Sequence, residues 1–108
     1  MMEFSYGQGI YIEDDKKLEG RIILSEHKLY LKGIDGDLAQ TYIPLEKIEL
    51  LRRTRKGVEV HVRPTISSRY VALFKGEKKY LSELVRDLVQ RRGLKKQFLK
   101  SEWIENAY

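Results

Sequence analysis

Hydrophobic and polar residues alternate along the chain as far as Gly76. The clearest run reads Val-Glu-Val-His-Val-Arg over residues 58–63. A period of two indicates a β-strand that turns one face toward a core. The same alternation, separated by turn residues, predicts further strands within 3–13, 20–25, 28–32, 41–43, 48–52 and 69–75.

Several interruptions of the alternation predict particular features. Gly7-Gln8-Gly9 lies inside the first predicted strand, where glycines favour a β-bulge. Asp35-Gly36, within the loop expected at 33–37, is a strong turn dipeptide. Pro44 lacks an N–H and holds the residue before it in extended backbone. We therefore expect residues 44–47 to form a corner between sheets.

The hydrophobic period changes after Gly76 and predicts one helix over residues 77–92. Four aliphatic residues in this segment recur at intervals of three and four, as on one stripe of an amphipathic helix: Leu81, Leu84, Val85 and Leu88. Gly93 suits the left-handed position that commonly follows a helix.

The composition indicates one globular domain. The chain has 108 residues, of which 42% are hydrophobic and 34% charged, enough for a single core. It has no Cys, which excludes disulfides and Cys-ligated zinc. We expect residues 1–93 to form the domain and 94–108 a C-terminal extension with a second short helix. A cytoplasmic location is expected, because neither a signal-peptide pattern nor an apolar run of about 20 residues is visible.

One stretch carries a resemblance to a known superfamily. It reads Gly-x-apolar-x-apolar-Ser-x-x-Lys-Leu-x-Leu and later Ile-Pro-Leu-x-x-Ile. The matching residues are Gly20, Ile22, Leu24, Ser25, Lys28, Leu29, Leu31, Ile43, Pro44, Leu45 and Ile48. In these residues the chain resembles PH-like domains of the GRAM and bacterial or archaeal types, and the likeness extends to about residue 92. A narrower likeness is to the PH-like part of the archaeal taxis proteins that link chemotaxis to the motility motor.

The resemblance implies a mainly β fold with a C-terminal helix. In PH-like domains, about seven antiparallel strands form a partly open barrel of two nearly orthogonal sheets, capped by one amphipathic helix. Such a fold says little about function. The chain departs from lipid-binding PH domains at residues 13–17, which read Glu-Asp-Asp-Lys-Lys where those domains have a basic loop. Three carboxylates there would repel an inositol phosphate.

Charge is distributed unevenly between the two halves of the chain. Residues 1–50 contain 6 Lys/Arg and 10 Asp/Glu, whereas residues 51–108 contain 15 and 6. Such asymmetry is typical of proteins with an acidic partner, although a charged solvated surface would look the same. The candidate anion- or partner-binding residues cluster around one predicted hairpin tip: Arg52, Arg53, Arg55, Lys56, His61 and Arg63. Anionic lipid or phosphate would suit this site, and a charged turn that keeps the hairpin soluble is the alternative.

Catalysis is not expected. The only imidazoles are His27 and His61, and neither has a Ser or Asp signature beside it. No phosphate-binding loop, zinc-protease motif or nucleophile elbow occurs. We therefore expect no catalytic residues, no metal site and no cofactor.

A protein-interaction role is the function we expect. The PH-like resemblance implies a groove between the helix and an adjacent strand in which a peptide can lie. The tail adds Trp103, Ile104 and Tyr108, residue types that often anchor interfaces, although they could equally fold onto the domain. We expect a non-catalytic scaffolding module that recruits a protein. Peripheral binding to anionic membrane lipid is the alternative, followed by non-specific nucleic-acid binding. The sequence does not indicate the oligomeric state.

Overall fold

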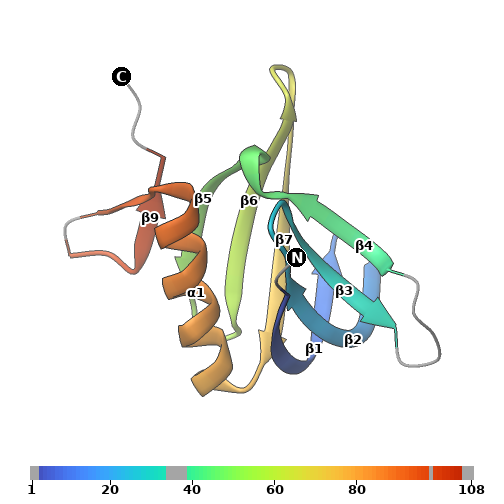
Figure 1. Cartoon of the computed structure of the whole chain (residues 1–108). Helices are drawn as coiled ribbons and strands as arrows, with labels where there is room; N and C mark the ends of the chain where they lie inside the picture. Colours follow the sequence, from blue (N-terminus) through green and yellow to red (C-terminus); the bar gives the residue numbers. More distant parts are fainter. Residues whose placement is uncertain (1–2, 34–38, 98, 106–108) are drawn as a thin grey trace.

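A computed structural model of the chain describes residues 3–33, 39–97 and 99–105 (Figure 1). Seven strands come first: β1 Phe4–Glu13, β2 Lys16–Leu24, β3 Lys28–Gly33, β4 Ala39–Pro44, β5 Ile48–Arg53, β6 Val58–Thr65 and β7 Ser68–Gly76. The helix α1 Lys78–Arg92 and two short strands, β8 Lys95–Lys96 and β9 Glu102–Ile104, follow. The seven strands and the helix confirm the expected mainly β fold. Most of the expected loop at 33–37 lies outside the described residues.

The nine strands form one antiparallel sheet in the order β4-β3-β2-β1-β7-β6-β5-β9-β8. The sheet is not closed into a barrel. Two separate sheets were expected, and β1 is the reason for the difference. It pairs with β2 along most of its length and also with β7 through residues 9–12, so it joins the two groups of strands. Figure 1 shows β2–β4 running diagonally past the steeper β5–β7.

The predicted bulge is present in β1. Its register with β2 shifts between Ser5 and Gln8, and Gly7 has a φ of 79°. An added Cβ at Gly7 would meet the ring of Tyr80 at 3.2 Å. The bulge therefore lets the first half of β1 pass close to the start of α1.

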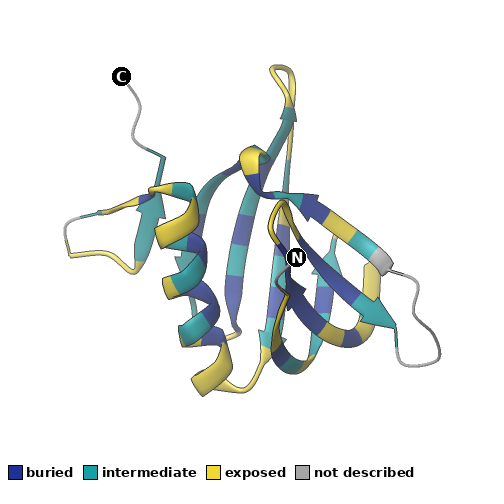
Figure 2. Ribbon diagram, viewed as in Figure 1, coloured by how far each residue is buried: buried dark blue, intermediate teal, exposed yellow. Residues whose placement is uncertain are grey.

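The core lies between the sheet and α1, as the buried positions in Figure 2 indicate. Val58, Val60 and Val62 are all at most 1% exposed, which confirms the alternation seen in the sequence. The predicted helical stripe is buried as well, and Leu84 and Leu88 have no exposed surface. Helix and sheet therefore bury their apolar sides against each other.

The chain turns at Pro44 as predicted. β4 ends there, residues Leu45–Lys47 form a single 3-10 turn, and β5 begins at Ile48. The N–H of Leu45 donates to the carbonyl oxygen of His27 at 2.9 Å. The corner is therefore tied to the turn between β2 and β3. It carries the chain from one edge of the sheet to the other half, where β5 lies.

The tail differs from the expectation of a second helix. Its described residues form β8 and β9, which pair with each other, and β9 also pairs with β5. The expectation rested on the presence of a few apolar residues in the tail, which carried no information about the free edge of β5. An unpaired edge strand presents N–H and C=O groups that a short extended segment can satisfy, and β9 does so.

Within residues 3–33, 39–97 and 99–105, no helix has the length and apolar character needed to cross a membrane.

Candidate functional site

The basic hairpin tip between β5 and β6 is a tight turn built around Thr54. The Thr54 hydroxyl oxygen accepts hydrogen bonds from the N–H groups of Lys56 and Gly57, at 3.1 and 3.2 Å. Gly57 has a φ of 152°, and an added Cβ there would lie 2.1 Å from the carbonyl oxygen of Phe74. The turn leaves Arg55 and Lys56 exposed at its end. Their side chains have no hydrogen-bond or ion-pair partner among the described residues.

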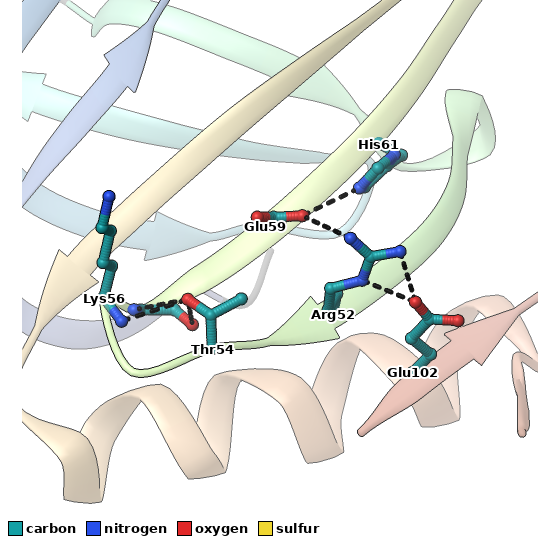
Figure 3. Close-up of polar contacts among 7 residues, drawn as sticks. Arg52, Thr54, Lys56, Glu59, His61 and Glu102 are labelled. Atoms are coloured by element: carbon teal, nitrogen blue, oxygen red, sulfur yellow. Dashed lines mark hydrogen bonds and ion pairs between the residues drawn. The ribbon is translucent and has the colours of Figure 1, made fainter. Parts of the chain in front are cut away.

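Arg52 lies between two carboxylates rather than facing solvent as a free cation (Figure 3). Its guanidinium donates to Glu102 on β9 and lies 3.5 Å from Glu59 on β6. The other Glu59 partner is His61, whose Nε2 is 3.2 Å from the same carboxylate oxygen. The charge of Arg52 is therefore already compensated within the fold.

The other predicted cations lie on different surfaces. Arg53 points toward α1 and donates to the Ser82 hydroxyl at 3.2 Å. Arg63 lies further along β6, where it lines a polar cavity of about 290 Å³ together with Lys47, Glu49 and Glu105. The structure thus brings Arg52 and His61 together around Glu59, but it does not gather the six predicted residues into one patch.

A larger groove of about 710 Å³ runs between α1 and the strands β5 and β9. Its helical side consists of residues spaced by three and four, which therefore share one face of α1. The residues that line the groove are Arg53, Ser82, Val85, Arg86, Val89, Gln90, Ser101 and Trp103. This size is within the range of sites that hold small ligands or peptide side chains.

The groove has an apolar floor and cationic rims. Val85 is buried, and Val89 and Trp103 are partly buried and pack against the core. Arg86, with a side chain 70% exposed, lies on the helical rim, and Arg53 lies at the end of β5. The only carboxylate paired with Arg86 among the described residues is Asp87, at 3.5 Å. A floor of this kind binds apolar side chains, and the rims favour negative charge beside them.

The tail residues predicted as a possible interface contribute directly to this groove. Trp103 lines it, while Ile104 lies opposite Leu50 in the pairing of β9 with β5. Tyr108 lies outside the described residues. Sequence reasoning left open whether the tail folds back, and the structure places Trp103 on its own domain.

Contacts on the opposite side of α1 hold the helix in position. The Tyr6 hydroxyl donates to Asp87 at 2.5 Å, and the Arg91 guanidinium lies over the ring of Phe4 at 5.6 Å. Burial, together with the hydrogen bond to Asp87, raises the pKa of Tyr6 above its usual value. Arg91 also donates to the carbonyl oxygen of Ser25. One flank of α1 is therefore fixed to β1 and to the turn that follows β2, and the other flank borders the groove.

The helical wall of the groove was missed at the sequence level. Val89 extends the predicted stripe by one position, and Ser82, Arg86 and Gln90 flank it. Their spacing was visible, but the partner wall comes from β9, whose pairing with β5 has no local signal. Among residues 3–33, 39–97 and 99–105, no group of three or more His, Asp or Glu is placed to hold a metal ion.

Comparisons with known proteins do not assign the chain to a family. No protein-family model matches the chain, and a search of the curated proteins finds no significant relative.

Proposed function

We propose that this chain is a non-catalytic, PH-like module that recruits a protein partner. The strand order β4-β3-β2-β1-β7-β6-β5, followed by a helix, is what a PH-like arrangement requires, and it supports that part of the proposal. The short strands β8 and β9 are then an addition specific to this chain.

The groove between α1 and β9 is the observation that carries the proposal. The occupant is an amphipathic segment of a protein partner that carries acidic residues. Its apolar side chains would pack on Val85, Val89 and Trp103, and its carboxylates would face the rims at Arg53 and Arg86. Charge complementarity of this kind steers association and fixes the orientation of the partner. Trp and Arg are also the residue types that most often dominate binding energy.

Membrane binding through the hairpin tip is the weaker candidate. Arg55 and Lys56 are the exposed cations there, whereas Arg52 is paired with Glu59 and Glu102. A cation near an anionic membrane contributes roughly 1 kcal/mol. Two such residues therefore supply about 2 kcal/mol, which corresponds to weak binding. Non-specific nucleic-acid binding would depend on the same two cations.

A pair of charge reversals distinguishes the groove from the tip. Arg86→Glu changes the groove rim, and Arg55→Glu changes the tip. Both residues are exposed, so both variants are expected to fold. Tagged full-length proteins are purified from the native cells, and proteins that co-purify with a stoichiometry near one are quantified.

The groove proposal predicts that Arg86→Glu lowers recovery of one defined partner about fivefold, the upper end for loss of an exposed charge pair. Arg55→Glu is expected to leave that recovery unchanged. Loss of the partner with Arg55→Glu alone would reject the groove and favour the tip.

A further inference from the structure

The edge of β5 is already occupied by a strand from the same chain. Residues 102–104 pair with it in the register Arg52↔Glu102, Leu51↔Trp103 and Leu50↔Ile104. Two flanking hydrogen bonds extend this pairing, from the Arg53 N–H to the Ser101 carbonyl oxygen at 2.8 Å and from the Glu105 N–H to the Glu49 carbonyl oxygen at 3.0 Å. The edge therefore accepts an added antiparallel strand about five residues long.

Side-chain contacts make this edge selective for particular residues of the bound strand. The guanidinium of Arg52 holds the Glu102 carboxylate, whose side chain is only 15% exposed. Trp103 reaches the groove floor beside Val89. At the other end, Arg92 donates to Glu105 at 3.3 Å. The bound strand thus has an acid, an aromatic residue, an aliphatic residue and a second acid in that order, and side-chain contacts hold the two acids and the aromatic residue.

The occupying strand is held lightly on its outer side. β9 has only three residues, and its outer neighbour β8 has two, both exposed lysines. The turn that joins them contains Leu99 with a φ of 59° and 85% of its surface exposed. A left-handed conformation costs a non-glycine residue roughly 1 kcal/mol or more. Short edge elements of this kind open at lower free energy than the core.

We propose that the β5 edge is a strand-binding site for a protein segment of the order acid–aromatic–aliphatic–acid, and that β9 occupies it in cis as a competitor. This inference rests on the proposed recruiting function and specifies its regulation. When β9 leaves, the edge of β5 becomes available together with the place beside Val89 that Trp103 fills on the groove floor. A partner segment that presents the same side chains replaces β9, and its aromatic residue then completes the groove floor in place of Trp103.

The tethered strand β9 sets the concentration that a competing partner segment must reach. A segment tethered by a short linker has an effective concentration in the millimolar range. A free peptide with the same side chains therefore competes only near that concentration. A partner binds at lower concentration if it also gains contacts in the rest of the groove, or if the tail is loosened.

The test uses the full-length protein and a synthetic peptide with the sequence of residues 100–108, labelled for fluorescence anisotropy. The chain has one Trp, so Trp103 reports the position of the tail. The probe peptide therefore carries Trp103→Phe and is silent in Trp emission. A control peptide carries Glu102→Lys and Trp103→Ala.

Two protein variants are compared with the wild-type chain. Glu102→Lys combined with Glu105→Lys removes both ion pairs and loosens β9. Lys100→Glu alters an exposed tail residue whose side chain takes no part in the pairing. The loosened variant is expected to bind the probe peptide with a Kd at least tenfold lower than the wild-type protein. Lys100→Glu is expected to retain the wild-type Kd, and the control peptide is expected not to bind.

On the wild-type protein, saturating probe peptide is expected to shift Trp103 emission to longer wavelength, because the ring leaves the groove for water. This readout does not depend on the loosened variant being folded. The inference is overturned if the peptide fails to bind, if it binds without moving Trp103, or if the loosened variant binds no more tightly than wild type. If the peptide displaces Trp103 but Arg86→Glu does not change partner recovery, the recruiting function of the groove is rejected. The strand-binding site at the β5 edge is then retained.

Discussion

The guanidinium of Arg52 on β5 and the carboxylate of Glu102 on β9 lie fifty residues apart in the sequence and form a hydrogen-bonded ion pair at the sheet edge. The pair ties the C-terminal strand to the domain. It also removes Arg52 from the set of cations available to an external anion. One contact therefore affects both candidate surfaces of the molecule.

Replacement of Glu102 by Ala is expected to loosen β9 without unfolding the domain. The Arg52 side chain is 44% exposed, so the lost pair is worth less than about 1 kcal/mol of global stability. The measurement is amide hydrogen exchange, which should accelerate at Trp103 and Arg53 while exchange at Val60, in the core, stays unchanged. Equal acceleration at Val60 would mean that β9 is part of the cooperative core instead.

Replacement of Gly57 by Ala is expected to destabilise the domain by about 2–4 kcal/mol, because the new Cβ would collide with the Phe74 carbonyl oxygen. Gly93→Ala is the matched control. Gly93 also has a positive φ, 65°, but an added Cβ meets nothing within 4 Å. Its cost is therefore limited to about 1 kcal/mol of backbone strain. Urea unfolding compares the two variants, and similar losses would show that the close approach at Gly57 is absent in solution.

Stability at alkaline pH is expected to depend on Tyr6. Its pKa is raised in the folded state by burial and by the hydrogen bond to Asp87, so the unfolded chain ionises first. The stabilisation from Tyr6 is complete below its usual pKa of about 10 and is lost as pH rises toward the folded-state value. The pKa of Tyr30 is raised to about 12, first by its hydrogen bond to Glu3, and it acts in the same direction.

Tyr6→Phe is the variant that measures this effect. It is expected to cost about 1–2 kcal/mol at pH 7 through the lost hydrogen bond to a carboxylate. The difference in unfolding free energy between the wild type and Tyr6→Phe should narrow above pH 10. The wild type loses stability there as Tyr6 ionises in the unfolded chain, whereas Phe does not ionise. Urea unfolding at pH 7 and pH 10.5 gives both values. If this difference in unfolding free energy stays constant or widens, Tyr6 ionises in the folded state at least as readily as in the unfolded chain.

Binding to anionic vesicles is expected to be weak and to depend on the hairpin tip alone. Arg55→Glu combined with Lys56→Glu should abolish sedimentation with vesicles that contain anionic lipid, at low ionic strength, where such contacts are strongest. Arg52→Gln should leave sedimentation unchanged, since Arg52 is compensated by Glu59 and Glu102. If Arg52→Gln weakens sedimentation as much as the double variant does, the ion pairs of Arg52 do not persist near lipid.

Local periodicity was sufficient to predict the strand at residues 58–63 and the helical stripe from Leu81 to Leu88, because each pattern reflects contact with one core. The Pro44 corner and the bulge at Gly7 were predictable for a different reason, since each follows from the backbone conformation of one or two residues. These features set the fold.

The candidate site could not be predicted in the same way, because its contacts join distant segments. Nothing near Arg52 in the sequence indicates that Glu102 pairs with it. Nothing in the tail indicates that residues 102–104 would extend the sheet at β5 rather than form a helix. The charge of a side chain can be read from sequence, whereas its compensation depends on the tertiary fold.

Site-specific photo-crosslinking in the native cells tests the central claim most directly. A photoreactive residue replaces Gln90, which is exposed on the groove face of α1. The control position is Lys78, which is exposed on the first turn of the same helix and lies outside the groove. If the groove recruits a partner, we expect one discrete protein adduct from position 90, and this adduct should disappear with Arg86→Glu. We expect no adduct from position 78. The same adducts from both positions, or an adduct from position 90 that survives Arg86→Glu unchanged, would contradict the recruiting function of the groove.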